Sequence, residues 1–375
     1  MTDRADDGMR RGVQASIDRP INANERMGRW LLFFGFLANV LSNSEAYLNV
    51  FPGAAKHGVF VLAAVISLMR MPRRSMLAMV VASPLALIYV FGDMGVYAFM
   101  VLTLASALPV IWAGINSVIE RRDYRYVAAL AVVSLIPAML SWQTMIADGF
   151  FTTTYGRPRM LMGYFHPKEA ATAFAIPMLL LMMMGRSAKT ILWAVAILFL
   201  WAVGSRNTAM MLFLGWALRW HGRLVVTVVL IFVPAFIFWL ALSGNWYETL
   251  DKLLSLRLTL WGEILRVGRV VTDMDMNFSD RFAADNFHVE AYVLIGAGSV
   301  LLTLTWIGTW IAMVGRRVSM HSWAYIAFAM LLFNTCFDSG IASTGNLAHI
   351  FLWTVMCSPI LGARRKAERV EAARL

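Results

Sequence analysis

An arginine stands among the apolar residues of a stretch that is otherwise patterned as an amphipathic helix. The stretch runs from Ser243 to Val289, and its first half repeats apolar residues at spacings of three and four, which predicts a helix. These apolar residues are Leu250, Leu253, Leu254, Leu258, Trp261, Ile264 and Leu265. At about 100° per residue, Arg257 points out of the same face. A guanidinium there needs an anion or a polar cavity, unless it reaches lipid headgroups or pairs with a carboxylate of its own fold.

Arg257 belongs to a larger group of basic residues in the stretches 147–168, 204–207 and 243–288. The group consists of Arg157, Arg159, Lys168, Arg206, Arg257, Arg266, Arg269 and Arg281. Arginine is planar and permanently charged, and it can donate two parallel hydrogen bonds to a phosphate, so a lipid diphosphate would suit these stretches. Arg266, Arg269 and Arg281 can equally pair with the acidic residues between 273 and 290. Arg206 has no acidic residue near it in the sequence, which favours an anion-binding role.

Groups that could accept a proton stand just before two apolar segments. His166 precedes one of them, and Asp285, His288 and Glu290 stand at the start of the other. A histidine there can act as a general base near neutral pH, for instance to activate a sugar hydroxyl. The alternative is helix capping, with Pro167 in a first turn and with Asp285 or Asn286 accepting backbone N–H bonds.

Motifs for other chemistries are missing. The sequence contains no HExxH, Walker A, GxSxG or EF-hand pattern, and His166 and His288 lack metal-ligand spacing. Cys336 and Cys357 stand in apolar segments, so neither a disulfide framework nor a thiolate metal site is expected. We therefore expect no metal and no cofactor.

Composition identifies the elements that must position these residues. Hydrophobic residues make up 59% of the chain, charged residues 15%, and mean hydropathy is +0.65, which indicates an integral membrane protein of the all-α class. We predict about twelve transmembrane helices. Their segments are 30–48, 57–70, 75–92, 96–118, 126–146, 169–185, 190–204, 207–219, 223–242, 289–314, 322–338 and 346–363.

Basic residues predict the orientation of these segments. With both termini in the cytoplasm, the inside loops hold 23 of the 33 lysine and arginine residues, as the positive-inside rule requires. The net charge of +11 therefore reflects membrane topology, and nucleic-acid binding is not expected. The predicted organisation is a cytoplasmic tail (1–29), nine helices (30–242), a larger periplasmic loop with an amphipathic helix (243–288), three helices (289–363) and a cytoplasmic tail (364–375).

Three stretches of residues 150–315 carry a resemblance to a known superfamily, and two shorter ones accompany them. Gly163-Tyr-Phe-His-Pro-Lys-Glu-Ala170 opens one span, Gly204-Ser-Arg-Asn-Thr-Ala209 forms a turn, and Leu256-Arg-Leu-Thr-Leu-Trp261 lies in the long loop. Asp285-Asn286 closes that loop and Gly296-Ala-Gly298 follows in the next span. In order and spacing the chain resembles the O-antigen ligase and O-antigen/exopolysaccharide polymerase superfamily of Wzy/WaaL-like proteins, although Lys168, Glu169 and Asp285 depart from its usual residues.

This resemblance implies a membrane-embedded, metal-independent, inverting glycosyltransferase of the bacterial inner membrane. Its donor would be an undecaprenyl-diphosphate-linked glycan at the periplasmic face, and its acceptor a second glycan. Carried over by position, Arg206 and Arg257 bind the diphosphate, and either His288 or Asp285 is the base. Other residues expected near the substrate are Arg157, Arg159, His166, Lys168, Trp261 and Arg281. Membrane lipid, a flippase and a chain-length regulator are the expected partners.

Three functions fit the sequence. The first is a polymerase that joins lipid-linked repeat units into an exopolysaccharide, capsule or O-antigen, and the position of Asp285 favours it. The second is a ligase that transfers the glycan to an acceptor. The third is a polysaccharide flippase or transporter, which would show charges in a central cavity and often paired halves, whereas this chain has an asymmetric loop and no internal repeat.

Overall fold

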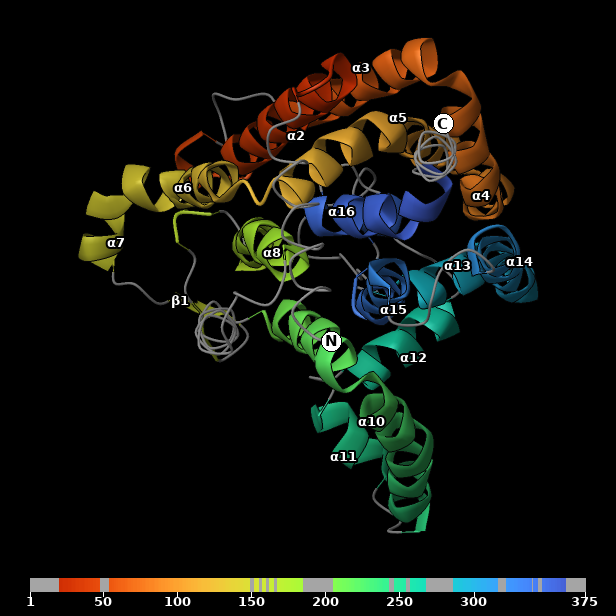
Figure 1. The fold of residues 1–375 in the computed structure, drawn as a ribbon. Coiled ribbons are helices and arrows are strands. Elements are labelled where there is room, and N and C mark those ends of the chain that lie inside the picture. Colours follow the sequence, from red (N-terminus) through yellow and green to blue (C-terminus); the bar gives the residue numbers. More distant parts are fainter. Residues whose placement is uncertain are drawn as a thin grey trace, which may run out of the picture. The chain divides into compact units, whose positions relative to one another are not determined.

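The computed structural model describes residues 20–47, 54–148, 152–154, 157–159, 162–164, 167–184, 205–242, 246–253, 257–267, 286–315, 322–338, 340–342 and 346–361 (Figure 1). Within these ranges the chain is almost entirely helical, as predicted. The exception is a short antiparallel pair, in which β1 (Thr152–Thr154) lies beside β2 (Arg157–Arg159).

The chain divides into two compact units. Unit 1 comprises residues 1–79, 103–212 and 344–375, and unit 2 comprises residues 80–102 and 213–343. The helices α4 (Pro72–Phe91), α5 (Gly95–Glu120) and α10 (Arg206–Leu242) are divided between the units. The other elements of unit 1 are α2 (Ala23–Ser42), η1 (Glu45–Tyr47), α3 (Ala54–Arg70), α6 (Tyr124–Leu140), α7 (Trp142–Asp148), β1, β2, α8 (Pro167–Met183) and α16 (Leu347–Met356). Those of unit 2 are α11 (Trp246–Leu253), α12 (Arg257–Val267), α13 (Phe287–Ile295), α14 (Ala297–Val314), α15 (Trp323–Thr335) and η4 (Gly340–Ala342).

Three of the described helices are long and apolar enough to cross a membrane: α4, α5 and α14. α10 adds a fourth if its halves count as one span, since Arg206–Gly222 and Leu224–Phe236 meet at 111° around a non-helical His221. Large apolar side chains on α14 are exposed, as they would be against lipid. Each predicted apolar segment overlaps a helix apart from 190–204, which lies outside the described residues. The count of twelve spans, the periplasmic loop and the domain boundaries stay predictions.

Polar side chains at the helix starts explain where several helices begin. Asn22 and Glu25 form a reciprocal capping box at α2, while Asp123, Asn286 and Asn346 accept backbone N–H bonds at α6, α13 and α16. Asn286 therefore caps α13, which was one of the two alternatives that the sequence offered for capping this helix. Prolines inside α4, α5, α6, α8 and α10 interrupt backbone bonds, which membrane helices tolerate because neighbouring groups satisfy the backbone again.

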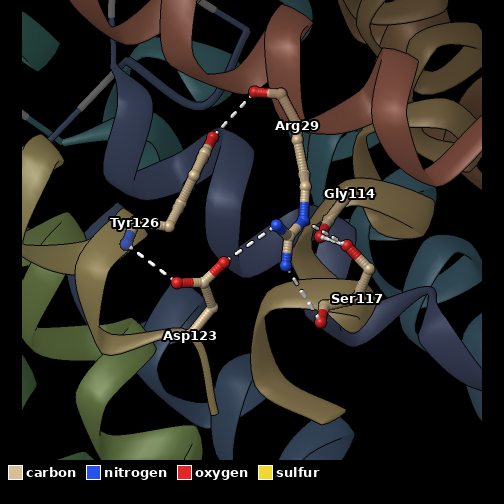
Figure 2. Close-up of polar contacts among 5 residues, drawn as sticks. All are labelled: Arg29, Gly114, Ser117, Asp123 and Tyr126. Carbon is tan, nitrogen blue, oxygen red and sulfur yellow. Dashed lines mark hydrogen bonds and ion pairs between the residues drawn. The ribbon is translucent and has the colours of Figure 1, made fainter. Parts of the chain in front are cut away.

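Contacts within unit 1 join segments that were predicted to lie on the same side of the membrane. At the predicted cytoplasmic ends, Arg29 bonds to Asp123 at 2.9 Å, and Nε and Nη2 of Arg29 also bond to Ser117, near the end of the predicted span 96–118 (Figure 2). At the predicted outer ends, Asn43 donates to Glu169 at 3.0 Å, and the Glu45 amide donates to the Gly163 carbonyl at 2.9 Å. In unit 1, therefore, the segments predicted to be cytoplasmic contact one another, and so do the segments predicted to lie outside.

One prediction about the long loop is wrong. The apolar pattern predicts one continuous helix, but α11 and α12 are two helices, because the Thr259 N–H of α12 donates to the Asp251 side chain of α11 at 3.1 Å, a contact that one continuous helix does not allow. Asp251, assigned to the polar face, is instead buried. Ile264 is buried as predicted. The break explains the burial of Asp251, because residues on either side of it no longer share one helical face and Asp251 accepts a hydrogen bond from Thr259 of α12.

Candidate functional site

The end of α15 places buried polar groups in an otherwise apolar helix. Asn334, Thr335 and Asp338 are all nearly inaccessible to solvent. Buried polar groups cost free energy unless they find hydrogen-bond partners, so their presence at one helix end is informative. Two residues that the sequence selected for chemistry, His288 and Arg257, contact this segment.

His288 reaches the segment from the start of α13. The Asn286 side chain accepts the backbone N–H groups of His288 and Val289, at 2.9 Å and 3.2 Å, which fixes the first turn of the helix. From that turn, Nε2 of His288 lies 3.1 Å from the Thr335 hydroxyl oxygen. Phe287 is buried beside it and packs against Tyr89 of α4 at 6.3 Å between ring centroids.

Arg257 reaches the same segment from the start of α12. Its Nη1 donates to the carbonyl of Phe337 at 3.4 Å, and its guanidinium carbon lies 5.7 Å from the centroid of the Phe337 ring. That carbonyl follows the C-terminus of α15, where the helix dipole is negative and favours a cation. The side chain is half-buried, so its charge is partly shielded from solvent.

We define the candidate site as Arg257, His288, Thr335 and Phe337. Arg257 and His288 come from separate helices, and the residues that they contact, Phe337 and Thr335, are only two positions apart in the chain. Burial lowers the pKa of His288, which keeps the imidazole neutral near pH 7. A neutral imidazole can accept a proton, and a guanidinium can stabilise a developing negative charge.

The other sequence-selected residues fall in different places. Arg206 is the exposed first residue of α10 and belongs to unit 1, so its pairing with Arg257 of unit 2 stays a prediction. Trp261 is half-buried one turn beyond Arg257 on α12, and Lys168 is half-buried in the first turn of α8. Arg157 and Arg159 occupy β2, opposite Thr154 and Thr152. His166, Arg281 and Asp285 lie outside the described residues.

Sequence reasoning missed Thr335 and the Phe337 carbonyl. A signal for the segment was available, because Asn334, Thr335 and Asp338 interrupt the apolar segment 322–338 near its predicted outer end. Polar residues inside a membrane segment are costly and often functional. Within the described ranges, no three His, Cys, Asp or Glu side chains gather as a metal site would require.

Comparison with known proteins adds no relative to this picture. No family model matches the chain, and no match is found among curated proteins or solved structures.

Proposed function

We propose that this protein is a membrane-embedded polysaccharide polymerase, which joins undecaprenyl-diphosphate-linked repeat units at the periplasmic face of the bacterial inner membrane. The proposal rests on the superfamily resemblance and on one structural observation. Arg257 and His288, selected independently from the sequence as anion ligand and base, both contact residues 335–337. A diphosphate ligand and a base must lie near one reacting carbon, so this convergence is what the reaction requires.

In the proposed reaction, His288 removes the proton from an acceptor sugar hydroxyl. The hydroxyl oxygen forms a bond to the anomeric carbon of the donor glycan, and the bond from that carbon to the diphosphate oxygen breaks with inversion. The diphosphate departs on its lipid carrier with the negative charge that it gains. Arg257 and Arg206 stabilise that charge, and Trp261 offers a ring on which a sugar can stack.

Glycan profiling in a deletion strain tests the proposal. The strain is complemented with wild type, Arg206→Ala, Arg257→Ala or His288→Ala, and the amount of each variant in the membrane is measured. Loss of Arg257 should lower polymer formation about 10²-fold or more, the order that one lost electrostatic contact to a transition state costs. Arg266→Ala is the matched control, because Arg266 is an exposed arginine of the same helix and its ion pair with Glu263 lies on the surface.

The products distinguish the candidate functions. Single repeat units accumulating on the carrier, with the protein present, support a polymerase. Complete polymer left on the carrier would instead mean a ligase. Normal polymer in all three variants would remove these residues from the reaction and would favour a transporter.

A further inference from the structure

The Thr335 hydroxyl makes two short contacts, and it has only one proton. Its oxygen lies 2.7 Å from the backbone carbonyl oxygen of Leu332, in the preceding turn of α15, and 3.1 Å from Nε2 of His288. A carbonyl oxygen can only accept a hydrogen bond. The hydroxyl proton therefore belongs to the Leu332 contact, because two oxygen lone pairs facing each other at 2.7 Å would repel.

The direction of that bond determines the tautomer of His288. With its proton directed at Leu332, the Thr335 oxygen can only accept from the histidine, so Nε2 carries the ring proton. In a neutral imidazole the other nitrogen, Nδ1, then holds the free lone pair. In the described part of the chain, no residue forms a hydrogen bond with Nδ1.

From this geometry we infer that Thr335 is a positioning residue, which holds His288 as the Nε2–H tautomer and leaves Nδ1 as the atom that accepts the proton. The inference rests on the proposed function for its catalytic meaning, but the tautomer itself does not. Thr335 is buried and anchored to its own helix, so its oxygen is a fixed reference point. The Asn286 cap fixes the histidine backbone, and the Phe287 ring stands edge-on to the imidazole at 5.5 Å.

Nitrogen NMR of the ¹⁵N-histidine-labelled full chain in lipid nanodiscs tests the tautomer directly. The His288→Gln variant identifies the His288 signals by their absence. In wild type near pH 7.5, Nε2 should resonate as a protonated ring nitrogen and Nδ1 as an unprotonated one. Thr335→Val, which removes the hydroxyl but keeps the shape, should populate the Nδ1–H tautomer, and Thr335→Ser should restore the wild-type pattern.

Two NMR outcomes would overturn the inference: an Nδ1–H tautomer in wild type, or an unchanged tautomer in Thr335→Val. Thr354→Val is the matched control, since Thr354 is also buried with its hydroxyl bonded to the carbonyl one turn earlier, at 2.7 Å, but it lies on α16. That variant should leave the His288 signals in place.

Activity separates a failure of this inference from a failure of the proposed function. With lipid-linked repeat units extracted from the deletion strain as substrate, Thr335→Val should lower kcat up to about 100-fold, the order that a misplaced catalytic group costs, with KM little changed. Thr335→Ser should recover most of the loss. A shifted tautomer in Thr335→Val, with normal polymer in both Thr335→Val and His288→Ala, would keep the tautomer assignment and reject His288 as the base of the proposed reaction. A loss of polymer in His288→Ala together with full activity in Thr335→Val would keep His288 as the base and reject the positioning role of Thr335.

Discussion

The carboxylate of Asp251 accepts hydrogen bonds from both the backbone N–H and the hydroxyl of Thr259, eight residues further along the chain. In one continuous helix, eight residues span about 12 Å along the axis, which a carboxylate cannot bridge. The contact therefore requires the break between α11 and α12. Asp251 satisfies free N–H groups at the start of α12, the helix that carries Arg257. Burial acts to raise the pKa of Asp251, but the hydrogen bonds from Thr259 and Leu258 together lower it.

Removing this cap should loosen the start of α12. We expect Asp251→Ala to destabilise the helix by about 1 kcal/mol, because substituting a capping side chain leaves N–H groups unsatisfied. Hydrogen exchange over residues 257–267, measured by mass spectrometry in nanodiscs, should become about fivefold faster. Glu263→Ala, which removes an exposed ion pair of the same helix, is the control and should change exchange little. Equal exchange in Asp251→Ala and wild type would contradict the capping role.

The pH dependence of polymer formation should report on His288. Burial lowers its pKa below the ordinary 6.5, and the neutral form is the base, so activity should fall only when the pH drops below 6.5. Stability should fall in the same direction, because below pH 6.5 the unfolded histidine binds a proton more readily than the folded one. The measurement is kcat/KM against pH with the extracted lipid-linked repeat units. An acid limb above pH 6.5 would argue against a buried neutral base.

The contacts in Figure 2 should act as one unit that ties α2 to the α5–α6 connection. Arg29 donates to Ser117 at 2.7 Å and to Asp123 at 2.9 Å, while the Tyr126 hydroxyl donates to the Arg29 carbonyl at 2.7 Å. Both partners of the ion pair are largely buried, so Arg29→Ala should cost about 1–3 kcal/mol of unfolding free energy by leaving polar groups without partners.

A double-mutant cycle tests this coupling. The measurement is thermal unfolding in detergent for Arg29→Ala, Asp123→Ala and the double variant, with the double expected to be more stable than the sum of the singles predicts. Arg70→Ala is the control, because Arg70 bonds to Asn24 at an exposed site. Additive effects of the two substitutions would mean that the ion pair contributes nothing.

The crossing of α2 and α5 should not tolerate a side chain at its centre. A Cβ added to Gly28 would lie 2.6 Å from the backbone nitrogen of Gly114, and one added to Gly114 would lie 2.6 Å from the backbone nitrogen of Arg29. Gly114→Ala must therefore push the helices apart, with an expected loss of about 1–3 kcal/mol in thermal unfolding. Gly308→Ala on α14, where a Cβ would meet nothing within 4 Å, should be neutral or stabilising. Equal stability of the two variants would rule out the close approach.

The sequence alone determined which parts of the chain are helical. Apolar segments and capping residues such as Asn22 and Asp123 are local features, so every predicted segment inside the described ranges overlaps a helix. The same local pattern could not reveal that α11 and α12 are separate. Residues 250–265 keep their apolar spacing whether or not the helix breaks, so the pattern could not show the contact between Asp251 and Thr259 that the break makes possible.

Tertiary structure alone decided the partners of the candidate chemical groups. The sequence selected Arg257 and His288 because a guanidinium on an apolar face and a histidine at a membrane edge are unusual. Their contacts, Phe337 and Thr335, lie 80 and 47 residues away in the chain. No periodicity connects residues that far apart, because such pairs form only when separate helices pack together. The tautomer of His288, and with it the atom that can accept a proton, follows from that packing.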